Sequence, residues 1–419
     1  MRIMVVGGGG REHAIIRKIR ENPRAERIYA LPGNGGIGAE AVRVPVQATD
    51  LPGIRAFALS KGIDFAVIGP DNPLAMGAVD LLEEAGIPCF GPTKAAAEIE
   101  SSKVFAKGLM RKYGIPTADY RVFGEPGEAM DYIRDQRMPM VIKADGLALG
   151  KGVLICESPA EAEGALKMMM EDRAFGDSGA RVVAEEFLTG PEVSVLTFTD
   201  GETLIPMVSS MDHKRIGEGD TGLNTGGMGA IAPNPFYTPE IAERCMREIF
   251  LPTIRAMKAE GRPFSGCLYF GLMLTDDGPK VIEYNCRFGD PETQAVLPLL
   301  ESDLLEIMLA TREGRLGETP VVFSGNSTAC VVMASKGYPA AYEKGKEIRI
   351  GDTGRGTVFH AGTDTEDGKL VTSGGRVLCV TAVSARLPDA LAEAYAGVES
   401  ISFDGAVYRH DIGLRALGK

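Results

Sequence analysis

The chain of 419 residues is too long for one hydrophobic core and should divide into roughly two to four domains. Hydrophobic residues at 44% and charged residues at 24% are typical of a globular protein, and a net charge of −12 excludes a general nucleic-acid binder. No apolar run approaches the roughly 18 residues of a membrane span, and no signal peptide precedes the first strand, so we expect a cytoplasmic protein.

Residues 1–102 alternate short apolar strands with helical stretches, which predicts an open parallel α/β sheet. Ligands of such sheets bind beyond the carboxyl ends of the strands, where the glycines 7–10 and Asp71 fall. The glycines do not fit the dinucleotide fingerprint G-x-G-x-x-G, because its third glycine position is Glu12 or His13. A glycine turn before a helix can still bind a phosphate monoester, and the alternative is a merely tight turn.

The pattern changes after residue 102 to mixed strands and helices, the first helix being expected to end at Gly114. The loop DGLALGKGV at 145–153 lies between two apolar strands and is not a P-loop, because a glycine and a strand follow Lys151. It predicts a glycine-rich hairpin folded over a polyphosphate, although plain hairpins also carry such residues. Glu185 and Glu192 could reach a purine nucleoside, or could be surface carboxylates at a domain joint.

A strand end rich in polar residues, VIEYNCRFGDPETQ, occupies residues 281–294. Glu283, Asn285 and Arg287 are two apart and share one strand face. A carboxylate, an amide oxygen and a guanidinium suit a hard cation beside an anion, and the alternative is a structural ion pair.

The seven cysteines form no C-x-x-C pair and are expected to be reduced core residues.

The order of SSK, VIKADGLALGKGV, EEFLTGPEVSV, DHKRIGEGDTGLNTGGMGA and EYNCRFGDPETQ resembles the ATP-grasp superfamily. From GGGGREHA to YRHDIG, nearly the whole chain is similar to its glycinamide ribonucleotide synthetase family. The resemblance implies an α/β and α+β multidomain protein with an ATP-grasp core of two α+β units and a strand-rich C-terminal domain. The expected domains are an N-terminal domain at 1–102, a central domain at 103–122 plus 191–326, a lid subdomain at 123–190 and a C-terminal domain at 327–419.

The resemblance also implies the reaction. Glycine would be ligated to 5-phosphoribosylamine through glycyl phosphate, with ATP and Mg²⁺ or Mn²⁺, by a monomer of the purine pathway that binds neither nucleic acid nor a membrane. An ATP-grasp ligase with a different carboxylate and amine, or an inactive nucleotide-binding regulator, are the alternatives. The intact Glu283, Asn285 and Arg287 count against the regulator.

The site residues follow position by position from the same resemblance. ATP would be bound by Lys103, Lys143, Gly146, Gly150, Lys151, Gly152, Glu185, Glu186, Leu188 and Glu192, and the metal by Glu283 and Asn285. The catalytic residues would be Arg287, Asp212 and Asp290, the last as the orienter of Arg287 or as a contact to the amino group of glycine. The substrates would contact Gly8, Gly9, Arg11, Asp71, Lys214, Asn224 and Lys336.

Three positions depart from the family pattern. Many ATP-grasp enzymes carry another carboxylate ligand on the strand before the metal motif, and here that position is Gly271. Asp71 stands where the family usually has glutamate, and Met211 where it usually has glutamine. The glycine leaves open whether another carboxylate completes the metal site.

Overall fold

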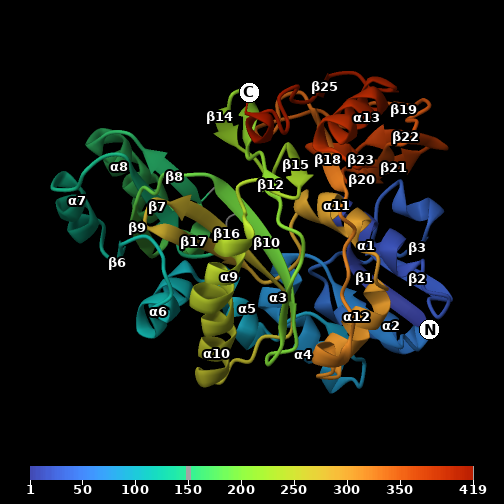
Figure 1. Ribbon diagram of the computed structural model, residues 1–419, viewed down its shortest axis with the longest axis horizontal. Coiled ribbons are helices and arrows are strands. Elements are labelled where there is room, and N and C mark those ends of the chain that lie inside the picture. Colours follow the sequence, from blue (N-terminus) through green and yellow to red (C-terminus); the bar gives the residue numbers. More distant parts are fainter. Residues whose placement is uncertain (148–151, 419) are drawn as a thin grey trace.

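The computed structural model describes residues 1–147 and 152–418, which fold around four larger sheets (Figure 1). All seven cysteines are buried and free, which confirms the prediction from their spacing. Each helix in the described part of the chain is too short or too polar to cross a membrane.

The N-terminal sheet is parallel, with the strand order β3-β2-β1-β4-β5. Its strands are β1 (Arg2–Gly7), β2 (Arg27–Pro32), β3 (Val42–Arg43), β4 (Phe65–Ile68) and β5 (Cys89–Phe90). The helices between them are α1 (Gly10–Ile19), α2 (Leu51–Lys61), α3 (Asp71–Met76) and α4 (Ala78–Glu84). The order reverses between β1 and β4, so a crevice opens where α1 and α3 begin. The predicted open parallel sheet is confirmed.

The central sheet is antiparallel, in the order β11-β10-β16-β17. Its strands are β10 (Glu192–Thr199), β11 (Leu204–Pro206), β16 (Gly266–Thr275) and β17 (Gly278–Asn285). One face packs on α5 (Lys94–Ser101), α6 (Lys103–Tyr113), α9 (Pro239–Cys245) and α10 (Leu251–Ala259), and the other on α11 (Glu292–Val296) and α12 (Leu304–Arg312). Val193 and Val195 point to the first face and Leu196 and Phe198 to the second, as the strand period requires. Gly114 ends α6 with φ 66°, as predicted.

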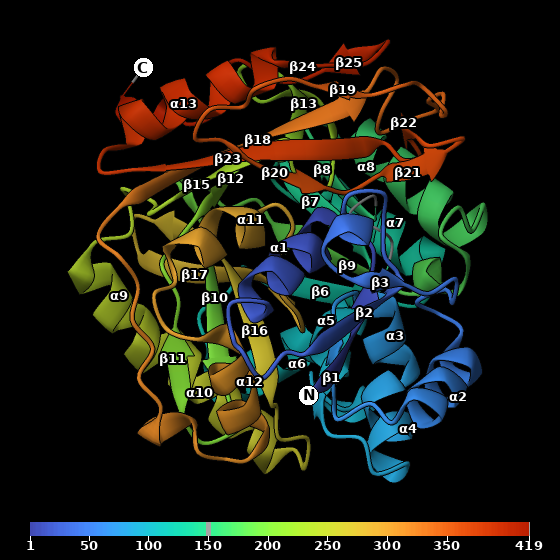
Figure 2. The same ribbon diagram turned by 90° about the vertical axis from the view of Figure 1, so that its right-hand side faces the viewer.

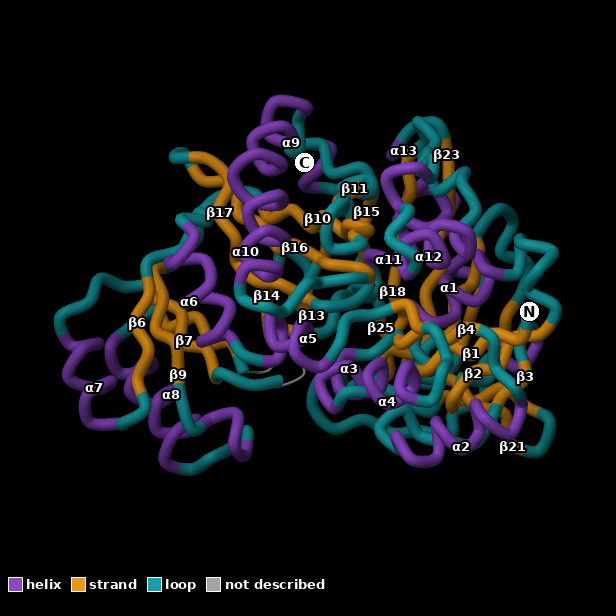
Figure 3. Tube along the Cα trace, turned by 90° about the horizontal axis from the view of Figure 1, so that it is seen from below, coloured by secondary structure: helices purple, strands orange, loops and turns teal. Residues whose placement is uncertain are grey.

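The lid sheet is a second antiparallel sheet, in the order β6-β9-β7-β8, at one side of the molecule (Figure 3). It consists of β6 (Tyr120–Phe123), β7 (Met140–Ala144), β8 (Val153–Cys156) and β9 (Val182–Glu186), with α7 (Pro126–Arg134) and α8 (Pro159–Leu166). Phe123, Ile142 and Leu166 belong to a hydrophobic core of its own. The β7–β8 hairpin brackets the predicted glycine-rich loop.

The C-terminal sheet packs under a long helix, α13 (Leu387–Glu399) (Figure 2). Its strands are β12 (Met211–Asp212), β15 (Gly229–Ala232), β18 (Ser327–Ser335), β20 (Thr357–His360), β23 (Arg376–Ser384) and β25 (Ala406–Val407). Short pairs beside it are β13 (Arg215–Gly217) with β14 (Thr221–Asn224), β19 (Arg349–Ile350) with β24 (Ile401–Ser402), and β21 (Thr363–Glu366) with β22 (Lys369–Thr372). β12 and β15 lie in the 191–326 range, yet they join this sheet through β18. The β13–β14 hairpin connects β12 to β15 and therefore lies at the boundary between the central and C-terminal domains.

Candidate functional site

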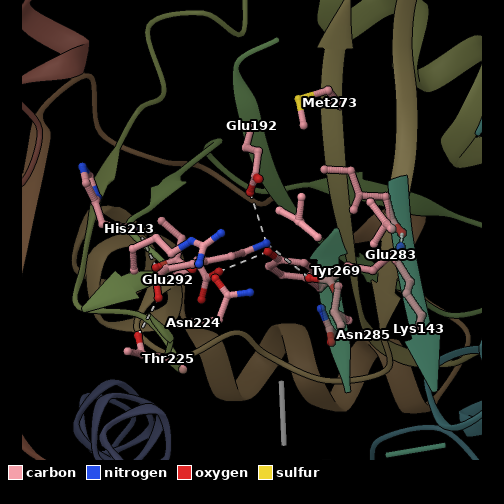
Figure 4. Close-up of a pocket in the computed structure, with 18 of the residues that line it drawn as sticks. Lys143, Glu192, His213, Asn224, Thr225, Tyr269, Met273, Glu283, Asn285 and Glu292 are labelled. Carbon is pink, nitrogen blue, oxygen red and sulfur yellow. Dashed lines mark hydrogen bonds and ion pairs between the residues drawn. The ribbon is translucent and has the colours of Figure 1, made fainter. Parts of the chain in front are cut away.

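A cavity of about 1260 Å³ lies where the lid, central and C-terminal sheets meet (Figure 4). We call one part the lysine end; it is lined by Lys103, Lys107, Lys143, Glu185, Glu283 and Asn285. The opposite part is the hairpin end, lined by Arg11, Asp212, Asn224, Asp290, Glu292 and Arg376. Lys214 stands between them, because its Nζ is 3.1 Å from a carboxylate oxygen of Glu192 and 3.5 Å from one of Glu283.

Lys103 begins α6 and is tied to the start of the glycine-rich loop. Ser102 caps the helix and also donates to Oδ1 of Asp145 at 2.9 Å. Nζ of Lys103 donates to the carbonyl of Gly146 at 3.0 Å, and no carboxylate in the described ranges forms an ion pair with it. Burial lowers the pKa of Lys103, and an anionic ligand beside its Nζ would favour the charged form.

Glu185 holds two further lysines at this end. Its Oε2 is 2.9 Å from Nζ of Lys143 and 3.3 Å from Nζ of Lys107. Its Oε1 is buried and accepts no hydrogen bond within residues 1–147 and 152–418. Burial lowers the pKa of Lys107 to about 8. Two amines facing one carboxylate leave a net positive charge beside Lys103, which favours a polyphosphate.

Glu283 and Asn285 project from the end of β17, and Glu283 is paired across the sheet with Gly271. A Cβ on Gly271 would lie 2.9 Å from Cγ of Glu283, so the glycine leaves that side chain room to turn into the cavity. Burial acts to raise the pKa of Glu283, but Lys214, Lys143 and Lys103 hold it below its usual value. An ionised carboxylate with an amide oxygen fits a hard cation that completes its shell with water and phosphate oxygens.

Arg287 lies beside this pair and is held by a carboxylate. Its Nη2 is 2.9 Å from Oε1 of Glu100, whose Oε2 accepts from the backbone N–H of Cys286 at 2.7 Å. Nη2 also donates to Oδ1 of Asn285 at 3.3 Å. Nε is buried and has no acceptor among the described residues. A planar cation with a free donor suits a carboxylate or phosphoryl group.

Asp290 has other partners. Its Oδ2 accepts from the backbone N–H of Arg11 at 3.1 Å, and its Oδ1 is 3.2 Å from Nη2 of Arg376. Burial acts to raise its pKa, but Arg376 and Arg11 keep it below the usual range. The expectation that Asp290 orients Arg287 is therefore wrong, since Glu100 takes that place and Asp290 joins the N-terminal and C-terminal domains.

Two carboxyl groups, Asp212 and Glu292, also face the hairpin end. Burial raises the pKa of both, and the charge of Glu292 raises that of Asp212 further. Oε1 of Glu292 accepts from the hydroxyl of Tyr269 at 3.1 Å, and that hydroxyl is 2.8 Å from Oγ of Ser194. Gly227, with φ 111°, passes close to Oδ1 of Asp212, where a Cβ would lie 2.7 Å from this oxygen. Two interacting carboxyl groups of this kind titrate together and can share a proton.

Models of the three domains of phosphoribosylglycinamide synthetase match most of the chain. The N domain matches residues 1–100, the ATP-grasp (A) domain residues 101–293 and the C domain residues 328–415. The chain belongs to the phosphoribosylglycinamide synthetase family.

Individual relatives agree over the full length. The phosphoribosylamine–glycine ligase of Vibrio parahaemolyticus is 48% identical over 426 residues, covering 100% of this chain and 99% of the relative. That of Caldanaerobacter subterraneus is 48% identical over 413 residues, with 98% and 99% covered. A crystal structure of the Thermotoga maritima enzyme of that name has a TM-score of 0.87 at 36% identity and covers 98% of this chain and 100% of that one. A biotin carboxylase of Campylobacter jejuni, with a TM-score of 0.75 at 14% identity and 97% and 92% covered, shares the fold.

Most residues proposed from the sequence meet in the one cavity. Its lining includes Arg11, Asp71, Lys103, Lys143, Gly152, Glu185, Glu186, Leu188, Glu192, Asp212, Lys214, Asn224, Glu283, Asn285, Arg287 and Asp290. Gly146 lies beside it, where a Cβ would be 2.1 Å from Oγ of Ser178. Gly150 and Lys151 lie outside the described residues.

Three predicted substrate residues lie elsewhere. Gly8 lines a second cavity of about 490 Å³ between the N-terminal and C-terminal sheets. Gly9 and Lys336 line neither cavity, and Lys336 is exposed. Substrate contacts by Gly8, Gly9 and Lys336 therefore stay predictions, and these residues do not line the cavity that holds Arg11.

Sequence reasoning missed several residues of the site. Lys107 follows Lys103 by four positions on a predicted helix, a spacing that places both on one face and that was available as a signal. Glu292 lies inside the quoted motif RFGDPETQ, but no function was assigned to it from the sequence. Glu100, Tyr269 and Arg376 carry no local signal, since each meets its partner from a distant segment.

Proposed function

We propose that the protein is a phosphoribosylamine–glycine ligase that forms glycinamide ribonucleotide, ADP and phosphate from glycine, 5-phosphoribosylamine and ATP. Family membership supports the reaction class. The observation that carries the proposal is the single cavity, in which the three lysines of the lysine end face the carboxyl groups and the hairpin at the other end. An ATP-driven ligation needs both sets within one water-excluded space.

The lysine end would bind ATP. Lys103 and Lys143 would face the phosphates, Gly146 and Gly152 would border them, and Glu185 would approach the nucleoside through its free Oε1. Glu186, Leu188 and Glu192 line the adjoining wall, with the backbone between them available to read the purine.

Glu283 and Asn285 would hold Mg²⁺ or Mn²⁺, which when bound neutralises the phosphates and polarises the transferring phosphoryl group. Residues 1–147 and 152–418 offer no group of three or more His, Cys, Asp or Glu suited to a metal ion. The protein share of the coordination would therefore be small, as is usual for Mg²⁺ bound together with a nucleotide.

The reaction would proceed in two displacements. A carboxylate oxygen of glycine, oriented by Arg287, attacks the γ-phosphorus, and the bond to the β-phosphate oxygen breaks to release ADP and leave glycyl phosphate. The amine of phosphoribosylamine then attacks the acyl carbon and expels phosphate. The nitrogen must lose a proton in this step, and Asp212 beside Glu292 is placed to accept it.

The acceptor would lie at the hairpin end. Asn224 lines that end, Lys214 stands beside it and Asp71 lines the same cavity; the phosphate of the ribosylamine would be on the Arg11 side rather than beside Gly8. We also propose that the protein acts in the cytoplasm as a monomer on these small molecules rather than on nucleic acid or a membrane. Light scattering at assay concentration checks the monomer.

ADP release measured with glycine and with phosphoribosylamine each left out in turn tests the function. We expect product only when both are present, with one ADP for each glycinamide ribonucleotide. Full turnover without either substrate would contradict the proposal and favour an ATP-grasp ligase for another carboxylate and amine.

A further inference from the structure

The β13–β14 hairpin carries part of the acceptor site but has little structure of its own. It is two-stranded, with a register shift between Arg215 and Gly217, and Leu223 on its second strand is 60% exposed. Lys214 precedes its first strand and Asn224 ends its second, and both line the cavity. An isolated two-stranded hairpin is marginally stable in water. Its position must therefore be set by other parts of the chain.

The C-terminal segment supplies that support through a buried arginine. Arg409 is 2% exposed and grips Asp411 with two bonds, Nε to Oδ1 and Nη2 to Oδ2, both 2.7 Å. Its Nη1 donates to Oδ1 of Asp220 at 2.8 Å and to the carbonyl of Arg215 at 3.0 Å. Arg215 is the register partner of Asn224. One guanidinium thus binds the turn of the hairpin and the strand between Lys214 and Asn224.

Neighbouring contacts bind the same region. Oδ2 of Asp411 accepts from the backbone N–H of Gly219 at 2.8 Å. Nε2 of the buried His213 accepts from the backbone N–H of Gly413 at 3.0 Å, which requires that nitrogen to be unprotonated. At the far end, the hydroxyl of Tyr338 accepts from the backbone N–H of Gly226 at 3.0 Å. The C-terminal domain therefore holds the hairpin at both ends.

We propose that Arg409 is a positioning residue for the acceptor substrate, which holds the β13–β14 hairpin so that Lys214 and Asn224 face phosphoribosylamine. The inference rests on the proposed function and adds to it a role for the C-terminal segment. Lysine cannot replace this arginine, because four acceptor oxygens at fixed angles need the planar fork. A shift of about 1 Å in groups that position a substrate can lower its turnover about 100-fold.

The two lysines that would bind the ATP phosphates do not depend on this contact. Lys103 and Lys143 stand on α6 and β7, and they contact Gly146, Ile282 and Glu185 rather than the hairpin. A defect in Arg409 should therefore appear in the KM for phosphoribosylamine and not in the KM for ATP.

The test compares Arg409→Lys with Arg386→Lys in the full-length protein. Arg386 makes the same two-bond contact to Asp389, at 2.8 and 2.9 Å, on the same domain but at the exposed surface. We expect Arg409→Lys to raise the KM for phosphoribosylamine at least tenfold, with the KM for ATP within twofold of wild type, and Arg386→Lys to change neither. Equal changes in both KM values, or none, in a protein with the wild-type melting temperature would overturn the proposal.

Two further variants guard against simple misfolding. Asp220 is half exposed, and Asp220→Asn should raise the KM for phosphoribosylamine in the same direction. If Arg409 acts through Asp220, the double variant should be less impaired than the product of the two single effects. Full additivity would mean that Arg409 acts elsewhere.

The rate of limited trypsin cleavage after Lys214 or Arg215 measures how accessible the hairpin is when no substrate is bound. We expect faster cleavage there in Arg409→Lys than in wild type or Arg386→Lys, and equal cleavage would contradict the proposed hold on the hairpin. This readout also separates two failures: wild-type protein that releases no ADP with glycine and phosphoribosylamine refutes the function, whereas unchanged cleavage refutes the role of Arg409.

Discussion

The lysine end and the hairpin end of the cavity are assembled in different ways. Lys103, Lys143 and Glu283 stand on three elements within residues 101–293, the range of a single domain model. At the hairpin end, Arg376 holds Asp290 and Arg409 holds the β13–β14 hairpin, and both arginines come from the C-terminal domain. ATP chemistry should therefore survive damage to contacts between domains, whereas acceptor binding should not.

The largest effect is expected at the lysine end. Glu283→Ala should lower kcat about a thousandfold while the protein stays folded, because a lost carboxylate ligand removes several kcal/mol of charge stabilisation. ADP release at a saturating Mg²⁺ concentration measures it. Asp277→Ala, in the exposed turn between β16 and β17, is the control and should be neutral. Near-normal activity of Glu283→Ala with an unchanged melting temperature would show that Glu283 is not a ligand.

Arg287 and its partner Glu100 should give the next largest effects. Arg287→Lys is expected to lower kcat about 100-fold, because lysine keeps the charge but not the fork that fits a carboxylate in two places. Glu100→Gln should cost about tenfold, because it keeps the shape and removes the ion pair that orients the guanidinium. Both are measured as steady-state kcat. Lysine restoring most of the activity would mean that only a point charge is needed.

The acid limb of the pH profile should move in Glu292→Gln. Burial, and next the charge of Glu292, raise the pKa of Asp212, so removing that charge lets Asp212 lose its proton at lower pH. The acid limb of kcat/KM for phosphoribosylamine is therefore expected to shift to lower pH, and that of the exposed Glu301→Gln should not. An unmoved limb in Glu292→Gln would remove Asp212 as the titrating group.

The smallest effect concerns stability rather than rate. Burial, and next Arg409, lower the pKa of His213 to about 4, whereas an unfolded histidine has a pKa of about 6.5. Its contribution to stability is thus complete above pH 6.5 and is lost as the pH falls through 4, a loss of about 3 kcal/mol.

His213→Gln should therefore show a smaller fall in melting temperature between pH 7 and pH 4.5 than wild type. His410→Gln, whose side chain is 67% exposed, serves as the control and should follow wild type. An equal fall in all three proteins would mean that His213 is not held neutral by its contact with Gly413.

Much of the fold and the lysine end could be predicted from the sequence. The alternation of strands and helices in residues 1–102 indicated a parallel sheet, because parallel strands are usually connected by crossover helices. Lys103 and Lys143 were proposed from the family resemblance, and Glu283 and Asn285 also because the strand period places them on one face. Gly8, Gly9 and Lys336 do not line the cavity with the other predicted residues, and no local sequence pattern records how far apart two distant segments lie in space.

The sequence by itself determined the family, the order of elements and the groups that would bind ATP, since these lie in short motifs at strand and helix ends. Only the tertiary structure decided that β12 and β15 leave the central domain to pair with β18, and that Arg376 reaches the carbonyl of Asp290 across 86 positions. The physical reason is that an ion pair between distant segments needs only one charge at each place. A single charged residue in a long chain looks the same whether its partner is solvent, Asp290 or the turn of a hairpin.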